Sequence, residues 1–122
     1  ETNFEKIIYR GESVSGLTLN PTSVFTMKSG EYLSVQFQVP STWKSGAGFL
    51  WGKSSGNTMV HVLLNDHKIF SGSIVEGIIT PLEFQSFHLA QFLIPGENQL
   101  RIEVQSPNEN AFFGLQRLLV VF

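Results

Sequence analysis

Residues 60–70 of the chain read VHVLLNDHKIF, and residues 87–104 read FHLAQFLIPGENQLRIEV. The first segment is apolar on both faces apart from His61, then passes through Asn65 and Asp66 into a second short apolar run. This order predicts two strands joined by a tight turn. In the second segment a Pro-Gly-Glu-Asn corner leads into a strand in which apolar and polar side chains alternate. We therefore expect two-faced β-structure with one face in a core.

The same period of two extends over most of the chain. In residues 32–39, YLSVQFQV, every second side chain is apolar and the side chains between them are polar apart from Tyr32. No window has the spacing of an amphipathic helix. We expect strands at 7–10, 16–19, 23–28, 32–39, 47–51, 58–64, 67–70, 84–89, 98–105 and 111–122. Ten short strands separated by turns predict an all-β fold, an antiparallel two-sheet β-sandwich of the jelly-roll class. The expected core residues include Leu33, Val35, Phe37, Val62, Leu100, Ile102 and Val104.

The composition limits the class of protein. The chain has 122 residues, enough for one domain, residues 1–122, with its own core. Only 15% of the residues are charged and the formal net charge is −2, so the surface is largely Ser, Thr, Asn and Gln. A phosphate backbone would need a basic surface, and nucleic acid is therefore excluded as the expected partner.

Cellular context is only partly indicated. The chain has no Cys, so it forms no disulfide. It has no apolar run long enough to span a bilayer. Because it begins with Glu1 and ends in a strand pattern, we expect a module excised from a longer multidomain protein. The uncharged polar surface is common in secreted modules and adhesins, which predicts an extracellular or secreted location.

Catalytic patterns are scarce. Asp66 is the only Asp and falls in the expected turn. Paired carboxylates for glycoside hydrolysis are possible among the glutamates Glu76, Glu83, Glu97, Glu103 and Glu109, but nothing in the sequence places two of them at the required separation. Carboxylates are usually solvated, and we expect that role for these five. The chain is therefore interpreted as a protein without enzymatic activity.

The three histidines suggest one further site. Pairing of the strands that carry His61 and His67 would bring these two side chains together, with His88 from a third strand as another metal ligand. No pair has a compact zinc spacing, and cross-strand packing explains each histidine equally well. We expect no bound metal from these residues.

The turn with Asn65 and the later LIPGENQLRI segment together resemble the galactose-binding-like jelly roll. This family includes many carbohydrate-binding modules and the sugar-binding domain of β-galactosidase-type hydrolases. The resemblance covers the second half of the chain and implies a sugar-binding function. It departs at Asp66, where the family has Gly. The resemblance also implies that structural calcium is possible, although a chain with one Asp is poor in the ligands that calcium prefers.

Aromatic side chains in loops carry the strongest functional signal. A sugar has an apolar CH face that stacks on an aromatic ring and a rim of hydroxyls that need polar partners. Trp43 falls in a turn-like stretch rich in Gly, Ser and Lys, and is our first candidate for such stacking. Trp51 follows Phe49 in an expected strand and suits the core or a ligand site. Tyr32 lies on the polar face of its strand, where it pairs across the sheet or stacks on a sugar.

Two other loops contain candidate ligand-binding residues. The long connection 71–83, where sugar-binding domains of the resembled family vary most, contains Glu76. The turn at 106–110 contains Asn108 and Asn110, at a position where related modules often direct an Asn toward the sugar. Either Asn also suits a turn, because Asn tolerates left-handed backbone geometry.

These observations predict a non-catalytic carbohydrate-binding module that recognises a polysaccharide or glycan through loop aromatics. An alternative is an oligomeric interaction domain of the tumour-necrosis-factor or C1q type. Residues 111–118, AFFGLQRL, resemble the final strand of those domains, and residues 29–33, SGEYL, resemble their Gly-x-Tyr strand entry. A small β enzyme such as a lyase is the third class considered.

Overall fold

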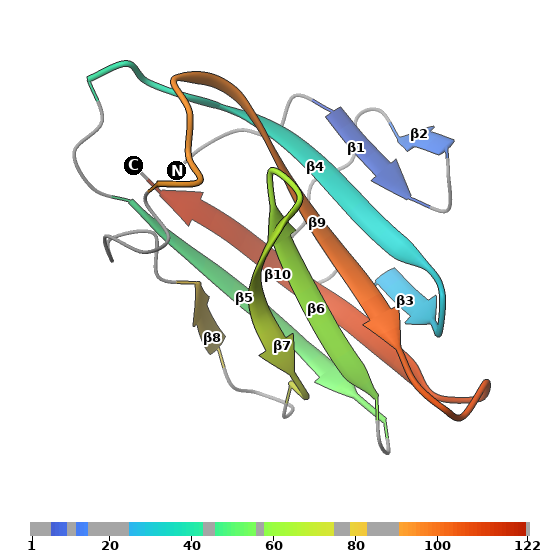
Figure 1. The fold of residues 1–122 in the computed structure, drawn as a ribbon. Coiled ribbons are helices and arrows are strands. Elements are labelled where there is room, and N and C mark those ends of the chain that lie inside the picture. Colours follow the sequence, from blue (N-terminus) through green and yellow to red (C-terminus); the bar gives the residue numbers. More distant parts are fainter. Residues whose placement is uncertain are drawn as a thin grey trace.

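The computed structural model describes residues 6–9, 12–14, 25–42, 46–55, 58–74, 79–82 and 91–121. These residues form strands and turns, and none belongs to a helix, so none belongs to a helix that could cross a bilayer. Two antiparallel sheets pack face to face (Figure 1). The strands are β1 (Lys6–Tyr9), β2 (Glu12–Val14), β3 (Phe25–Lys28), β4 (Tyr32–Val39), β5 (Ala47–Ser54), β6 (Met59–Leu64), β7 (His67–Gly72), β8 (Ile79–Leu82), β9 (Gly96–Gln105) and β10 (Phe112–Val121). The prediction of an all-β, antiparallel jelly-roll sandwich is confirmed.

The six-stranded sheet has the order β2-β1-β4-β9-β6-β7. Its central pair is β4 and β9, which run antiparallel in register from Tyr32 opposite Glu103 to Val39 opposite Gly96. β6 pairs with the other edge of β9, so that His61 lies opposite Glu103. Because side chains alternate along each strand, residues opposite one another share a face. Tyr32, Glu103 and His61 therefore form one row across the outer face.

The four-stranded sheet has the order β3-β10-β5-β8. Its main pair, β10 and β5, contains an irregularity between Leu115 and Arg117, as expected for a β-bulge. Gly52 lies against the buried ring of Phe113, and a Cβ at Gly52 would come within 2.5 Å of that ring. The close approach of β5 to Phe113 therefore requires glycine at this position.

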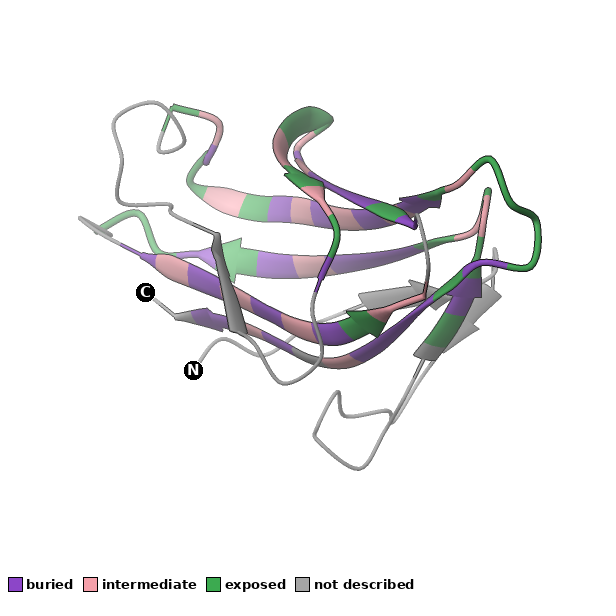
Figure 2. Ribbon diagram, turned by 90° about the horizontal axis from the view of Figure 1, so that it is seen from below, coloured by how far each residue is buried: buried purple, intermediate pink, exposed green. Residues whose placement is uncertain are grey.

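The core lies between the two sheets. Figure 2 shows buried and less buried positions alternating along β5 and β9. All seven residues that the sequence predicted for the core are at most 1% exposed: Leu33, Val35, Phe37, Val62, Leu100, Ile102 and Val104. These predictions are confirmed, because the period-two pattern identifies the inward face wherever the outer face is polar.

The expected strand list needs two corrections. The connection predicted for residues 71–83 is shorter, because β7 continues to Gly72 and β8 occupies Ile79–Leu82. Pro81 is typical of a turn, but among the described strands β8 pairs with β5 alone and lies at the edge of its sheet, where a residue without an N–H group is tolerated. The short strand β2 was not predicted either. The strands expected at 16–19 and 84–89 lie outside the described residues.

The two asparagines of the family resemblance form one structural unit, the asparagine corner, made of Asn65, Asn98 and residues 91–97. Asn98 is 1% exposed, and its amide nitrogen donates to the carbonyl oxygens of Ile94 and Gly96 at 2.7 and 3.0 Å. Its amide oxygen accepts from the Ile94 nitrogen at 3.0 Å and from the Asn65 amide at 2.7 Å. The Asn98 side chain is therefore fully bonded within the protein.

The β6–β7 hairpin holds the other half of this corner. Asn65 and Asp66 have φ values of 49° and 69°, the left-handed geometry that a two-residue hairpin turn needs. The Asn65 side chain accepts from the Gln99 nitrogen at 2.9 Å and donates to the Phe92 carbonyl oxygen at 2.7 Å. The ring of His67 stacks on Phe92 with centroids 4.2 Å apart. Asn65 and Asn98 therefore stabilise the chain path into β9.

Candidate functional site

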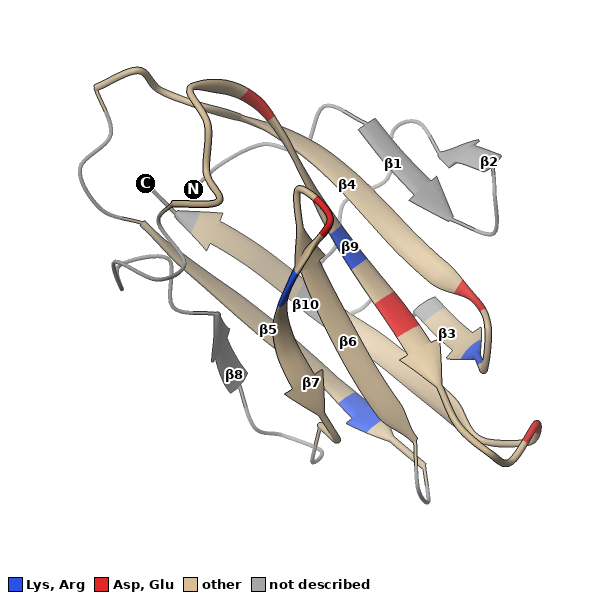
Figure 3. Ribbon diagram, in the orientation of Figure 1, with Lys and Arg blue, Asp and Glu red and all other residues tan. Residues whose placement is uncertain are grey.

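The outer face of the six-stranded sheet is polar over its central pair. The side chains that β4 and β9 direct outward are Tyr32, Ser34, Gln36, Gln38, Glu97, Gln99, Arg101, Glu103 and Gln105. Figure 3 shows that the charged positions of the described residues are scattered, without a cluster of Lys and Arg. A surface of amides and a few paired charges suits a ligand rich in hydroxyl groups.

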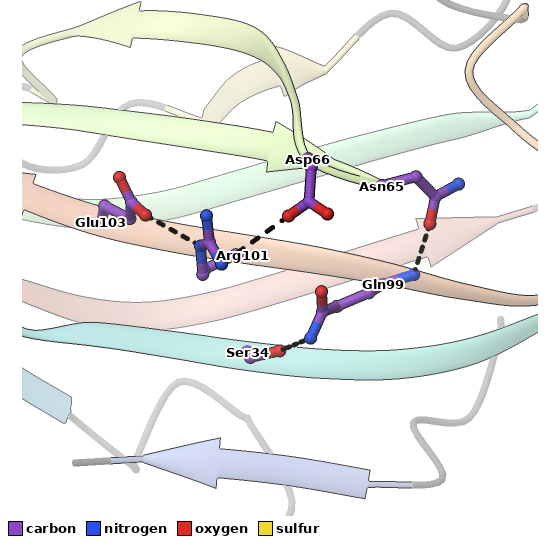
Figure 4. Close-up of polar contacts among 6 residues, drawn as sticks. All are labelled: Ser34, Asn65, Asp66, Gln99, Arg101 and Glu103. Carbon is purple, nitrogen blue, oxygen red and sulfur yellow. Dashed lines mark hydrogen bonds and ion pairs between the residues drawn. The ribbon is translucent and has the colours of Figure 1, made fainter. Parts of the chain in front are cut away.

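Hydrogen bonds and ion pairs order these side chains (Figure 4). The Gln99 amide donates to the Ser34 hydroxyl at 2.8 Å. Nε of Arg101 lies 2.8 Å from a carboxylate oxygen of Glu103, and Nη1 lies 3.7 Å from Asp66. The Arg101 guanidinium also lies 6.0 Å from the centre of the Tyr32 ring. Arg101 is therefore paired with two acids and lies beside the Tyr32 ring.

Two adjoining hollows lie where β9 ends, and we call them together the β9 hollow. The first, of about 170 Å³, is lined by Gly30, Glu31, Tyr32, Glu103, Val104 and Gln105. The second, of about 430 Å³, is lined by Ser29, Met59, His61, Gln105, Ser106 and Pro107. Gln105 lines both hollows. The β9 hollow thus combines an aromatic ring, a thioether, carboxylates, an amide and an imidazole.

The rim of the β9 hollow is tied together by hydrogen bonds between distant segments. The Ser29 hydroxyl donates to the Ser106 carbonyl oxygen and accepts from the Ser106 nitrogen, both at 3.0 Å. The Gly30 nitrogen donates to the Val104 carbonyl oxygen at 2.9 Å, and the Val104 nitrogen donates to that of Glu31 at 3.1 Å. Gly30 has a φ of 88°, which favours glycine. The β3–β4 turn is therefore fixed against the end of β9.

His61 lies beneath the hollow. Its side chain is on the outer face of β6, and the residue is only 8% exposed. Nε2 lies 3.0 Å from the amide oxygen of Gln105. The other ring nitrogen, Nδ1, is buried and has no hydrogen-bond partner. Because buried polar groups are nearly always bonded, this nitrogen is an unusual feature of the site.

The residues that the sequence predicted for ligand binding lie in different parts of the structure. Tyr32 is exposed and lines the β9 hollow. Trp51 is half-buried and alternates with the buried residues Leu50 and Gly52, so it faces outward from the four-stranded sheet. The expectation that Trp51 suits the core is therefore corrected. Trp43 and Glu76 lie outside the described residues.

The two loop asparagines take part in the β9–β10 turn. The Asn108 side chain accepts from the Asn110 nitrogen at 2.9 Å, and the Asn108 carbonyl oxygen accepts from the Ala111 nitrogen at 3.0 Å. Both residues are exposed. Asn108 has the turn-forming role that its sequence context allowed. The turn begins next to Pro107, which lines the β9 hollow.

The sequence patterns did not identify His61, Glu103 or Gln105 as glycan-binding residues. The sequence does mark His61 as unusual, because it is the one ionisable residue in the apolar strand β6. Glu103 and Gln105 looked like solvated positions of an alternating strand. Only the register of β4, β9 and β6, which the sequence does not specify, brings all three beside Tyr32.

The described residues do not support the histidine metal site. β6 and β7 pair so that His61 lies opposite Ser71 and His67 lies opposite Leu64, and the two histidines are therefore apart. His88 lies outside the described residues. Within the described part of the chain, no group of three His, Asp or Glu side chains is placed to hold a metal ion. Asp66 faces Arg101, a poor arrangement for binding calcium.

No protein-family model matches the chain, and a comparison with curated proteins finds no match. Among solved structures, the fold is similar to a carbohydrate-binding module, CBM36, in complex with calcium and xylotriose. The TM-score is 0.55 at 10% identity, over 93% of this chain and 98% of that chain. It is also similar to a family 35 carbohydrate-binding module from an environmental isolate, with a TM-score of 0.55 at 11% identity, over 100% of this chain and 88% of that chain. At such identities the likeness establishes a shared fold.

Proposed function

We propose that this protein is a non-catalytic carbohydrate-binding module. One observation carries the proposal: the exposed ring of Tyr32 lines a hollow together with the Glu103 carboxylate and the Gln105 amide. An aromatic face beside hydrogen-bonding side chains matches the two surfaces of a sugar ring. The likeness to the two carbohydrate-binding modules supports this function through the fold, and the hollow supports it through its chemistry.

The finer form of the proposal includes loop aromatics. Trp43 is the loop aromatic that we propose as a second stacking residue, with Glu76, Asn108 and Asn110 as polar neighbours. Trp51, which faces outward from the four-stranded sheet, is proposed as a separate aromatic contact for the glycan on that sheet. The module acts as one part of a longer extracellular protein and holds that protein on a glycan. Calcium binding, as in the CBM36 complex, is not part of the proposal for the described residues.

We propose no catalytic role for the module, although two glutamates, Glu31 and Glu103, line the β9 hollow. A carboxylate oxygen of Glu103 lies 2.8 Å from Nε of Arg101, which positions Glu103 as a hydrogen-bond acceptor. Cleavage of a glycosidic bond needs a second carboxyl group that acts as an acid, whereas the Glu31 carboxylate accepts a hydrogen bond from the Lys28 nitrogen at 2.7 Å. We therefore expect glycan binding without release of sugar.

Binding to a broad set of soluble and insoluble polysaccharides tests the proposal. We expect retardation of the wild-type protein in gels that contain its glycan, and no new reducing ends after long incubation. Tyr32→Ala and Trp43→Ala are compared with Gln38→Ala, a change on the same strand and face as Tyr32. Absence of any glycan ligand in the whole set would refute the proposed function.

A further inference from the structure

The β9 hollow contains one polar atom that the protein leaves unbonded. Nε2 of His61 faces a carbonyl oxygen, which only accepts, so Nε2 carries the hydrogen and donates to Gln105. In the neutral ring Nδ1 is then an acceptor, and it has no donor among the described residues. A buried acceptor without a partner costs free energy that a hydroxyl of a ligand would recover.

The surroundings of Nδ1 allow access from the hollow. Met59 lies two residues from His61 on the same face of β6, lines the same hollow and is 38% exposed. A methionine side chain changes conformation readily because it is unbranched. Gln105, which covers the other ring nitrogen, is also exposed. A change in the conformation of Met59 would therefore widen the hollow beside His61 without a change in the strands.

The charges around the hollow restrict the class of ligand. Glu31 and Glu103 are among its lining residues, and none of the lining residues described is Lys or Arg. Arg101, behind Glu103, is already shared between Glu103 and Asp66. A carboxylate or sulfate on a sugar would therefore meet like charge without a free cation. Each carboxylate has more acceptor positions than a single ion pair uses, which suits hydroxyl donors.

We infer that the β9 hollow binds an uncharged oligosaccharide, which stacks one ring on Tyr32, donates one hydroxyl to Glu103 and donates a second to Nδ1 of His61. This inference rests on the proposed function and names its ligand class and its polar contacts. Tyr32, Glu103 and His61 lie in one row across β4, β9 and β6, about two strand spacings long, which more than one sugar ring is needed to cover. The rim bonds of Ser29 keep this row in place before the ligand arrives.

Titration calorimetry with trisaccharides of known charge tests the ligand class. The probes are xylotriose, cellotriose and mannotriose as neutral sugars, trigalacturonate as the acidic sugar and the glucosamine trimer as the cationic one. We expect at least one neutral trisaccharide to bind about tenfold or more tightly than the acidic one, and no more weakly than the cationic one. Glu103→Gln should narrow the difference between neutral and acidic sugars. Preference for a charged sugar, or binding of none of the neutral ones, overturns the inference.

A pair of substitutions at position 61 tests the contact with Nδ1. An Asn side chain places a polar atom near the position of Nδ1, whereas a Gln side chain reaches the position of Nε2. We expect His61→Gln to weaken binding of the neutral trisaccharide about tenfold, and His61→Asn to weaken it about threefold or less. Thermal unfolding of both variants shows that each is folded. Equal losses in the two variants overturn the role of Nδ1, because a structural effect would not distinguish them.

The location is tested with Tyr32→Ala and the control Gln38→Ala. Tyr32→Ala should weaken binding about tenfold or more, and Gln38→Ala by less than about twofold. Unchanged binding in Tyr32→Ala, Glu103→Gln and His61→Gln overturns the location. If the wild-type protein still binds a glycan in that case, the proposed function stands and Trp43 is the next residue to test. If the wild type binds no glycan at all, the proposed function fails instead.

Discussion

The two ends of strand β9 use polar side chains in opposite ways. At its beginning, in the asparagine corner, the buried Asn98 has all of its hydrogen-bonding groups bonded within the protein. At its end, in the β9 hollow, a ring nitrogen of His61 is buried without a partner and Tyr32 is exposed. A saturated set of bonds stabilises the fold, whereas an unsaturated one leaves groups for a ligand. The residues that resemble a family therefore belong to the end that builds the fold.

A substitution in the core should cause the largest loss of unfolding free energy, against which the polar sites can be compared. Phe37 is fully buried on the inward face of β4. Phe37→Ala should lower the free energy of unfolding by about 3 to 5 kcal/mol, because it removes a large side chain from a packed interior. Urea unfolding measures the change. A loss below about 1 kcal/mol would mean that the face of β4 is wrongly assigned.

Among the polar sites, the asparagine corner should show the largest loss of unfolding free energy on substitution. Asn98→Ala removes four hydrogen bonds, to Asn65, Ile94 and Gly96, from a side chain that is only 1% exposed. We expect a loss of about 2 to 4 kcal/mol in the free energy of unfolding, with glycan binding unchanged in the folded fraction. Urea unfolding and calorimetry measure the two quantities. A loss of binding equal to that of Tyr32→Ala, at a temperature where the variant is folded, would contradict the separation of the two ends.

Substitution at the rim of the β9 hollow should cause a smaller loss of unfolding free energy than substitution in the asparagine corner. Ser29→Ala removes two hydrogen bonds to the backbone of Ser106 at a partly buried position. The expected loss is about 1 kcal/mol of unfolding free energy, together with weaker binding, because the rim is less well positioned. Ser71→Ala, at an exposed serine on β7, serves as the control for stability alone, because Ser71 lies opposite His61. Equal stability of the two variants would show that the rim bonds contribute nothing measurable.

Sequence patterns predicted the fold well because they describe local geometry. Alternation in β4 and β9 identified the buried residues, and the Asn65-Asp66 turn and the Pro95-Gly96 corner identified the connections. The hollow depends on register: Tyr32, Glu103 and His61 come from three strands, and only their pairing places them in one row. Edge pairing likewise explains why Pro81 did not end a strand. Trp43 and Glu76 stay predictions, because both lie outside the described residues.

The smallest expected change in stability is at His61, and it distinguishes the two ends most directly. His61→Phe keeps a ring of similar size and removes the buried Nδ1, at the expense of one hydrogen bond to the exposed Gln105. Removal of an unbonded buried polar atom offsets the loss of a bond near the surface. The free energy of unfolding should therefore change by less than about 1 kcal/mol, while binding of the neutral sugar falls about tenfold. Urea unfolding and calorimetry on the same preparation measure both values. If His61→Phe destabilises the protein as much as Asn98→Ala does, His61 is a structural residue like Asn98, and the proposed difference between the two ends of β9 is wrong.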